Sequence, residues 1–108
     1  MRYTLVCEGF DPTPAIKAHV NENIVALEGL APKNEMLHVF LSMPAPHRFH
    51  AMFKVLAGKK EVIARETEEN LYHAVNGARQ HMERRLRADR DKAREARRKP
   101  LPEFEDSP

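Results

Sequence analysis

The sequence contains a single cysteine and no long apolar segment, and these two absences exclude several kinds of protein. Cys7 has no second cysteine with which to form an intrachain disulfide or a zinc-binding pair. No window approaches the roughly 20 apolar residues that span a bilayer, and the N-terminus has no apolar stretch followed by a small-residue cleavage site. We therefore expect a soluble, cytoplasmic protein with no membrane partner.

The chain also lacks the residue groupings on which catalysis depends. Its 4 glycines are isolated from one another, so no glycine-rich phosphate loop is present. The 6 histidines are scattered, and His47 and His50 beside His38 form the one set that suggests a metal site. Histidines near a turn are more often ordinary surface residues. We expect no metal, no cofactor, no small-molecule substrate and no enzymatic activity.

The spacing of apolar residues predicts four strands and two helices. Alternation predicts strands at about residues 2–8, 36–43, 49–56 and 61–65. Steps of three and four predict a first helix, capped by Thr13, with the buried stripe Ile16, Val20, Ile24 and Leu27. A second helix is predicted over residues 67–99, with Thr67 as its N-cap and Tyr72 packed against the sheet.

This order of elements, β-α-β-β-β-α, predicts a two-layer α+β domain. A right-handed crossover places the first helix on one face of the four-stranded sheet, and the apolar stripe of the second helix requires the same face. The opposite face of the sheet should stay partly open. We expect one domain over residues 1–99, followed by a flexible acidic tail at residues 100–108.

The net charge of +2 conceals an uneven distribution of charge along the chain. Residues 1–78 carry 8 Lys/Arg against 9 Asp/Glu, residues 79–99 carry 10 against 4, and residues 100–108 carry 0 against 3. A helix with a surplus of 6 positive charges favours an anionic partner, most commonly a nucleic acid. The pairs Glu83–Arg87 and Glu95–Lys99, at i,i+4 spacing, would neutralise a fraction of this surplus.

Several motifs in the sequence resemble those of the ribosome hibernation factors. They are Phe10-Asp11-Pro12-Thr13-Pro14-Ala15-Ile16, Leu27-Glu28, Asn70-Leu71-Tyr72-His73-Ala74-Val75-Asn76 and Met82-Glu83-Arg84-Arg85-Leu86. The resemblance covers about residues 1–92, and the length is similar to that of the short forms of the family. It implies a protein that binds the small ribosomal subunit and its rRNA at the decoding region, and that inhibits translation in stationary phase or stress without catalysing a reaction.

The resemblance also implies which residues contact rRNA. Basic residues of the last helix carry much of this contact in the family, and the corresponding residues here are Arg84, Arg85, Arg87, Arg90 and Lys92. Lys17 occupies a commonly basic position early in the first helix. Relatives usually have further lysines in that helix, where this chain has Asn21-Glu22-Asn23 and Ala26, so the surface of the first helix is less basic here.

The sequence leaves two alternatives and one question open. The protein could be a general duplex RNA-binding module without ribosome specificity, or an interaction domain whose charged helix meets an acidic protein. In the family, a short form that ends soon after the helix promotes pairing of ribosomes, whereas a longer, partly acidic tail opposes it. The acidic end of this chain is somewhat similar to that longer tail, although it is shorter, and whether a second ribosome is a partner stays open.

Overall fold

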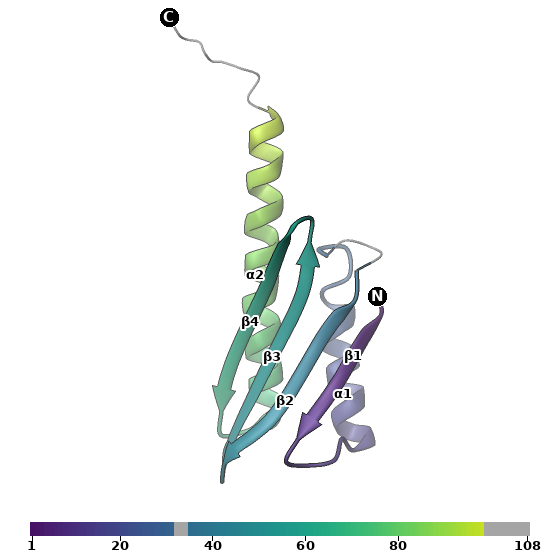
Figure 1. Cartoon of the computed structure of the whole chain (residues 1–108), viewed down its shortest axis with the longest axis vertical. Helices are drawn as coiled ribbons and strands as arrows, with labels where there is room; N and C mark the ends of the chain where they lie inside the picture. The colour runs from purple at the N-terminus through teal and green to yellow at the C-terminus, as the bar shows by residue number, and fades with distance from the viewer. Residues whose placement is uncertain (32–34, 99–108) are drawn as a thin grey trace, which may run out of the picture.

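The chain folds into two layers, a four-stranded sheet and two helices (Figure 1). The computed structural model describes residues 1–31 and 35–98. Its elements are β1 (Tyr3–Glu8), α1 (Pro14–Val25), β2 (Leu37–Ala45), β3 (Arg48–Ala57), β4 (Lys60–Glu68) and α2 (Leu71–Arg98). The predicted α+β class and β-α-β-β-β-α order are confirmed. The predicted acidic tail lies outside the described residues.

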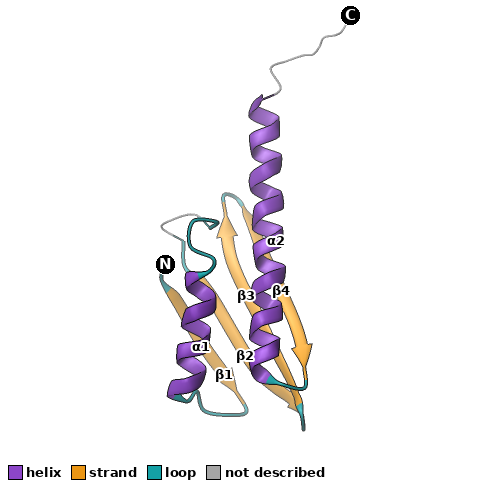
Figure 2. Cartoon of the chain, turned by 180° about the vertical axis from the view of Figure 1, so that it is seen from behind, coloured by secondary structure: helices purple, strands orange, loops and turns teal. Residues whose placement is uncertain are grey.

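The strands lie in the order β1-β2-β3-β4, so β1 and β4 are the two edges of the sheet. β1 pairs with β2 in parallel, whereas β2–β3 and β3–β4 are antiparallel. A parallel pair needs a crossover connection, and α1 provides it. Figure 2 shows that α1 and α2 lie side by side on the same face of the sheet.

The hydrophobic core lies between the sheet and the helices. Alternate residues of β2 and β3, such as Val39 and Phe53, are fully buried under the helices and meet Val20 of α1 and Met82 of α2 in one cluster. The other face of the sheet has no helix on it, and Val6 of β1 is 49% exposed there. The predicted arrangement, with both helices on one face and the opposite face partly open, is therefore correct.

The start of α1 follows its local sequence. The Thr13 hydroxyl accepts a hydrogen bond from the backbone N–H of Ile16 at 3.1 Å, and Pro14 occupies the first turn, where a backbone N–H would have no helical partner. The helix ends at Val25, yet Leu27 is fully buried, because the turns after the helix keep it against the core. Thr13 is thus the N-cap that the sequence predicts.

The start of α2 differs from the prediction. Thr67 is a residue of β4, where its hydroxyl hydrogen-bonds to Nδ1 of His50 on β3 at 3.0 Å. The N-cap is Asn70, whose Oδ1 accepts hydrogen bonds from the backbone N–H groups of Tyr72 at 2.8 Å and His73 at 3.2 Å. Pairing with β3 extends β4 to Glu68, beyond the predicted end at residue 65. Cross-strand pairing thus overrides the local capping signal.

Tyr72 also differs from the prediction that it packs against the sheet. It remains 39% exposed, and its ring meets the ring of His19 edge to face at 4.8 Å between centroids. Nε2 of His19 lies 3.3 Å from the backbone carbonyl oxygen of Tyr72. Tyr72 therefore joins α2 to α1.

α2 approaches β4 closely at Gly77. A β-carbon built on Gly77 would lie 2.7 Å from Cγ of Glu66 and 3.0 Å from its carboxyl carbon, which is closer than carbon atoms pack. The absent side chain lets Glu66 run along the surface of the helix toward its next turn. Glycine at this position costs helix propensity, but it allows this packing.

The variant Gly77→Val should be less stable, although valine favours a helix more than glycine does. Because the branched side chain would collide with Glu66, we expect the free energy of unfolding to fall by about 1–3 kcal/mol in urea denaturation. Ala88→Val, at an exposed position of the same helix, is the control and should change stability by less than about 1 kcal/mol. A Gly77→Val protein as stable as the wild type would contradict the close packing.

Candidate nucleic-acid interface

The charged residues of α2 lie on two flanks of its buried stripe. The stripe consists of Leu71, Ala74, Val75, Ala78, Met82 and Leu86. We call the side toward α1, with Arg79, Glu83 and Arg87, the α1 flank, because Arg79 contacts Asn23 of α1. The side with His81 and Arg85 is the β4 flank, because these residues contact Glu66 and Ile63 of β4.

Asn23 anchors the α1 flank to α1. The residue is 5% exposed, and both the nitrogen and the oxygen of its amide are hydrogen-bonded. Nδ2 donates to the carbonyl oxygen of His19 at 2.9 Å and to Oδ1 of Asn76 at 3.2 Å, and Oδ1 accepts from Nε of Arg79 at 3.0 Å. A buried amide is costly unless it is paired, so this network fixes how the two helices pack.

Glu83 holds two arginines of the α1 flank. Its carboxylate lies 2.7 Å from Nη1 of Arg79 and 2.9 Å from Nη2 of Arg87. Hydrogen bonds from Arg87 and then Arg79 lower the pKa of the Glu83 carboxyl. The predicted Glu83–Arg87 pair is confirmed, whereas the side chains of Glu95 and Lys99 are not described. One carboxylate thus neutralises part of the charge of this flank.

The β4 flank contains a chain of three polar side chains. Nη2 of Arg84 lies 2.8 Å from Nδ1 of His81, and Nε2 of His81 lies 2.9 Å from Oε1 of Glu66. Because a guanidinium has no acceptor, Nδ1 accepts from Arg84 and Nε2 carries the proton donated to Glu66. A hydrogen bond with Glu66 also raises the pKa of the Glu68 carboxyl. Arg84 itself is paired with no carboxylate in the described chain.

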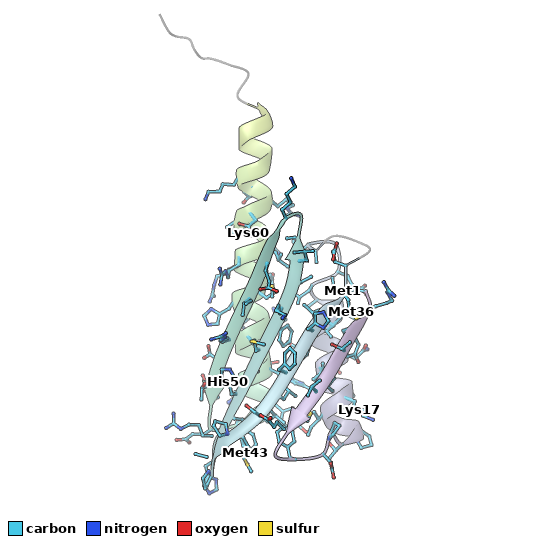
Figure 3. All side chains as sticks on the ribbon, in the orientation of Figure 1. Met1, Lys17, Met36, Met43, His50 and Lys60 are labelled. Atoms are coloured by element: carbon cyan, nitrogen blue, oxygen red, sulfur yellow. The ribbon has the colours of Figure 1, made fainter. Side chains whose placement is uncertain are left out.

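The structure places the six sequence-predicted site residues in two regions. Arg84, Arg85, Arg90 and Lys92 are exposed on α2 and form no ion pair with the side chains described at residues 1–31 and 35–92, whereas Arg87 is bound to Glu83. Lys17 lies apart, because it is on the side of α1 that faces β1. Figure 3 shows it at the opposite corner of the molecule from Lys60, which is paired with Asp89 of α2 at 3.5 Å.

The positive charge of Lys17 influences the Cys7 thiol on β1. Burial raises the pKa of the Cys7 thiol, Asp11 adds to this rise, and Lys17 opposes it. The Cys7 thiol is thus disfavoured as a thiolate, which makes it a poor nucleophile. Lys17 is therefore placed to act on a different surface from the α2 arginines.

Sequence reasoning did not select Arg79 as a site residue. Arg79 lies within the basic segment, but its partner Asn23 is 56 residues away in the chain. No local pattern connects two residues so far apart. A sign of this contact in the sequence is Asn23 itself, a polar residue between the apolar positions Val20 and Ile24 of α1.

The histidines of the sheet do not form a metal site in the described part of the chain. Nδ1 of His38 lies 2.9 Å from the Thr4 hydroxyl, and His50 contacts Thr67, so each ring has a hydroxyl partner. The side chains described at residues 1–31 and 35–92 include no group of three or more His, Cys, Asp or Glu suited to a metal ion. Within the same residues, neither helix has the length and hydropathy needed to span a bilayer.

The Glu83 pairs should make stability depend on pH in a defined direction. Because folding lowers the pKa of this carboxyl from 4.5, its contribution is complete above pH 4.5 and is lost as the pH falls through the folded-state pKa. Glu83→Gln should lower the free energy of unfolding by about 1 kcal/mol at pH 7, and the difference should shrink as the pH falls below 4.5.

Urea denaturation at several pH values measures this difference. Glu8→Gln is the matched control, since Glu8 is exposed on β1 and forms no ion pair with the described residues. A difference between wild type and Glu83→Gln that stays constant from pH 7 to pH 3 would show that ionisation of Glu83 adds no stability, and would contradict the lowered pKa.

Comparison with known proteins places these features in a family. Residues 3–94 match the family described as sigma 54 modulation protein / S30EA ribosomal protein. The fold is similar to that of the protein Y N-terminal domain from Thermus thermophilus, with a TM-score of 0.73 and 22% identity over 82% of this chain and 99% of that chain. It is also similar to a ribosomal subunit interface protein from Coxiella burnetii, with a TM-score of 0.73 and 14% identity over 84% of this chain and 99% of that chain. Among curated protein sequences, none matches this chain significantly. The β-α-β-β-β-α domain with its basic second helix therefore belongs to the sigma 54 modulation protein / S30EA ribosomal protein family.

Proposed function

We propose that the protein binds the small ribosomal subunit at the decoding region through α2 and inhibits translation in the cytoplasm during stationary phase or stress. Membership of a ribosome-associated family supports a ribosomal partner. The observation that carries the proposal is the set of exposed cations on α2, Arg84, Arg85, Arg90 and Lys92, that have no carboxylate partner among the side chains described at residues 1–31 and 35–92. Such cations are available for phosphate oxygens.

The shape of α2 fits this proposal. Residues up to Leu86 hold the helix against the sheet, and its last turns, after Asp89, extend beyond the end of the sheet (Figure 1). A helix of this kind exposes several turns to an RNA surface while its other end stays anchored. Occupying the site where mRNA or tRNA binds is sufficient for inhibition, so the proposal requires no catalytic group.

The distribution of charge indicates that α2, rather than α1, provides most of the RNA contact. The exposed surface of α1 toward α2 contains Glu22, and the neighbouring Asn23 is buried. Lys17 lies on the opposite side of α1, toward β1. In this chain, we therefore expect the site residues of α2 to supply most of the phosphate contacts.

Charge reversal on α2 tests this proposal. We expect the double variant Arg84→Glu/Arg90→Glu to bind purified small ribosomal subunits at least about tenfold more weakly in co-sedimentation, with a log–log salt slope smaller by about 2, since two phosphate contacts are lost. The matched control is Arg2→Glu/Arg48→Glu, which makes the same change in net charge at two exposed positions, one just before β1 and one at the start of β3. The control should bind like the wild type and, like it, inhibit cell-free translation.

A competition experiment separates ribosome-specific binding from general RNA binding. Bulk duplex RNA, in phosphate excess over the small subunits, should fail to displace the wild-type protein. Displacement by duplex RNA would favour a general RNA-binding module. Unchanged small-subunit binding by the α2 double variant would instead indicate that the helix has a different partner.

A further inference from the structure

The outer edge of β4 and the β4 flank of α2 enclose a groove of about 520 Å³. Its walls are formed by Glu61, Ile63, Ala64 and Arg65 from the strand and by His81 and Arg85 from the helix. The groove is separate from the α1 flank. Arg65 is the cation that β4 contributes to the lining of the groove. The pattern of the sequence does not connect this residue with α2.

The backbone of β4 supplies hydrogen-bond donors to this groove. Nη1 of Arg85 donates to the carbonyl oxygen of Ile63, so this carbonyl points away from β3. In an antiparallel pair, the N–H and C=O of one residue point to the same side, and the direction alternates along the strand. The N–H groups of Ile63 and Arg65 therefore point outward into the groove, while Val62 and Ala64 bond to β3.

The side chains around the groove also favour an anion. Arg65 is exposed and forms no ion pair with the described residues. Arg85 uses one of its five N–H donors for the carbonyl oxygen of Ile63. The two carboxylates nearby are already engaged, since Glu61 lies 3.7 Å from Lys54 and Glu66 is bound to His81. The groove thus combines the Arg85 guanidinium with two unpaired backbone N–H groups, and Arg65 lines it from the strand, on the sheet face away from α2. Together these are a suitable set of donors for a phosphate.

We propose that this groove binds a backbone phosphate of RNA, with Arg65 and Arg85 as the contacting side chains. The proposal rests on the proposed function and adds a contact made by the sheet. A polyanion is favoured over an isolated acidic side chain because cations continue along the same side of the molecule. Arg84 and Lys92 follow on α2, and Lys59 follows at the β3–β4 turn. An RNA strand that passes along α2 then meets the groove between helix and strand edge.

The variant Arg65→Gln tests the groove without removing the α2 cations. We expect its affinity for purified small ribosomal subunits to fall by about three- to tenfold at low salt, and its log–log salt slope to decrease by about 0.7–0.9, the value for one phosphate contact. Arg48→Gln is the matched control, because it removes an exposed arginine at the start of β3 that does not line the groove. The control should leave affinity and slope unchanged, and thermal unfolding should show that both variants are folded.

Hydrogen exchange supplies a second measurement that does not depend on substitution. In the free protein, the outward N–H groups of Ile63 and Arg65 have no strand partner and should exchange quickly. In the complex with small subunits, a peptide that contains residues 61–66 should gain protection, whereas one from β1, at the opposite edge of the sheet, should not.

The outcomes distinguish the groove from the proposed function. If wild-type protein fails to bind small subunits, the proposed function fails. If the wild type binds but Arg65→Gln keeps the wild-type salt slope, or if residues 61–66 gain no protection, the groove proposal is overturned and the function stands. A loss of affinity in Arg65→Gln with an unchanged slope would indicate a contact with ribosomal protein, and would also overturn the phosphate assignment.

Discussion

The burial of the first half of α2 against β3 and β4 is the constraint on which the rest of the structure depends. Ala74, Val75, Ala78 and Met82 are almost completely buried, and the stripe ends with Leu86. This packing fixes the rotation of the helix about its own axis, and so determines which residues face α1, which face β4 and which face solvent. The positions of the cations follow from this rotation and need no further structural device.

The two flanks of α2 use their charges differently. On the α1 flank, Asn23 and Glu83 hold Arg79 and Arg87 in one network, which satisfies the buried amide and joins the helices. On the β4 flank, Arg84 and Arg85 contact a histidine and a backbone carbonyl, and so keep their full charge. The first arrangement contributes to the fold, while the second leaves the positive field available to a partner.

The features that depend on local periodicity could be predicted from the sequence. Those that depend on contacts between residues far apart in the chain could not. The alternation of β2, the stripe of α2 and the Thr13 cap are local and were predictable. The N-cap of α2 was not, because pairing of Phe49 with Glu68 extends β4 past Thr67. The position of Lys17 on the β1 side of α1 and the approach of α2 at Gly77 likewise depend on tertiary packing. The rRNA contacts of the basic residues stay predictions.

The parallel pairing of β1 with β2 has a consequence for the order of folding. Thr4 and His38 meet across this pair although 34 residues separate them, whereas short turns join β2, β3, β4 and α2 in succession. Closing a long loop costs more chain entropy than closing a short turn, so contacts of low sequence separation form more readily. We therefore expect the antiparallel meander and α2 to form the folding nucleus, with β1 and α1 docking onto it afterwards. The element that carries the basic surface would then mature before the N-terminal third of the domain.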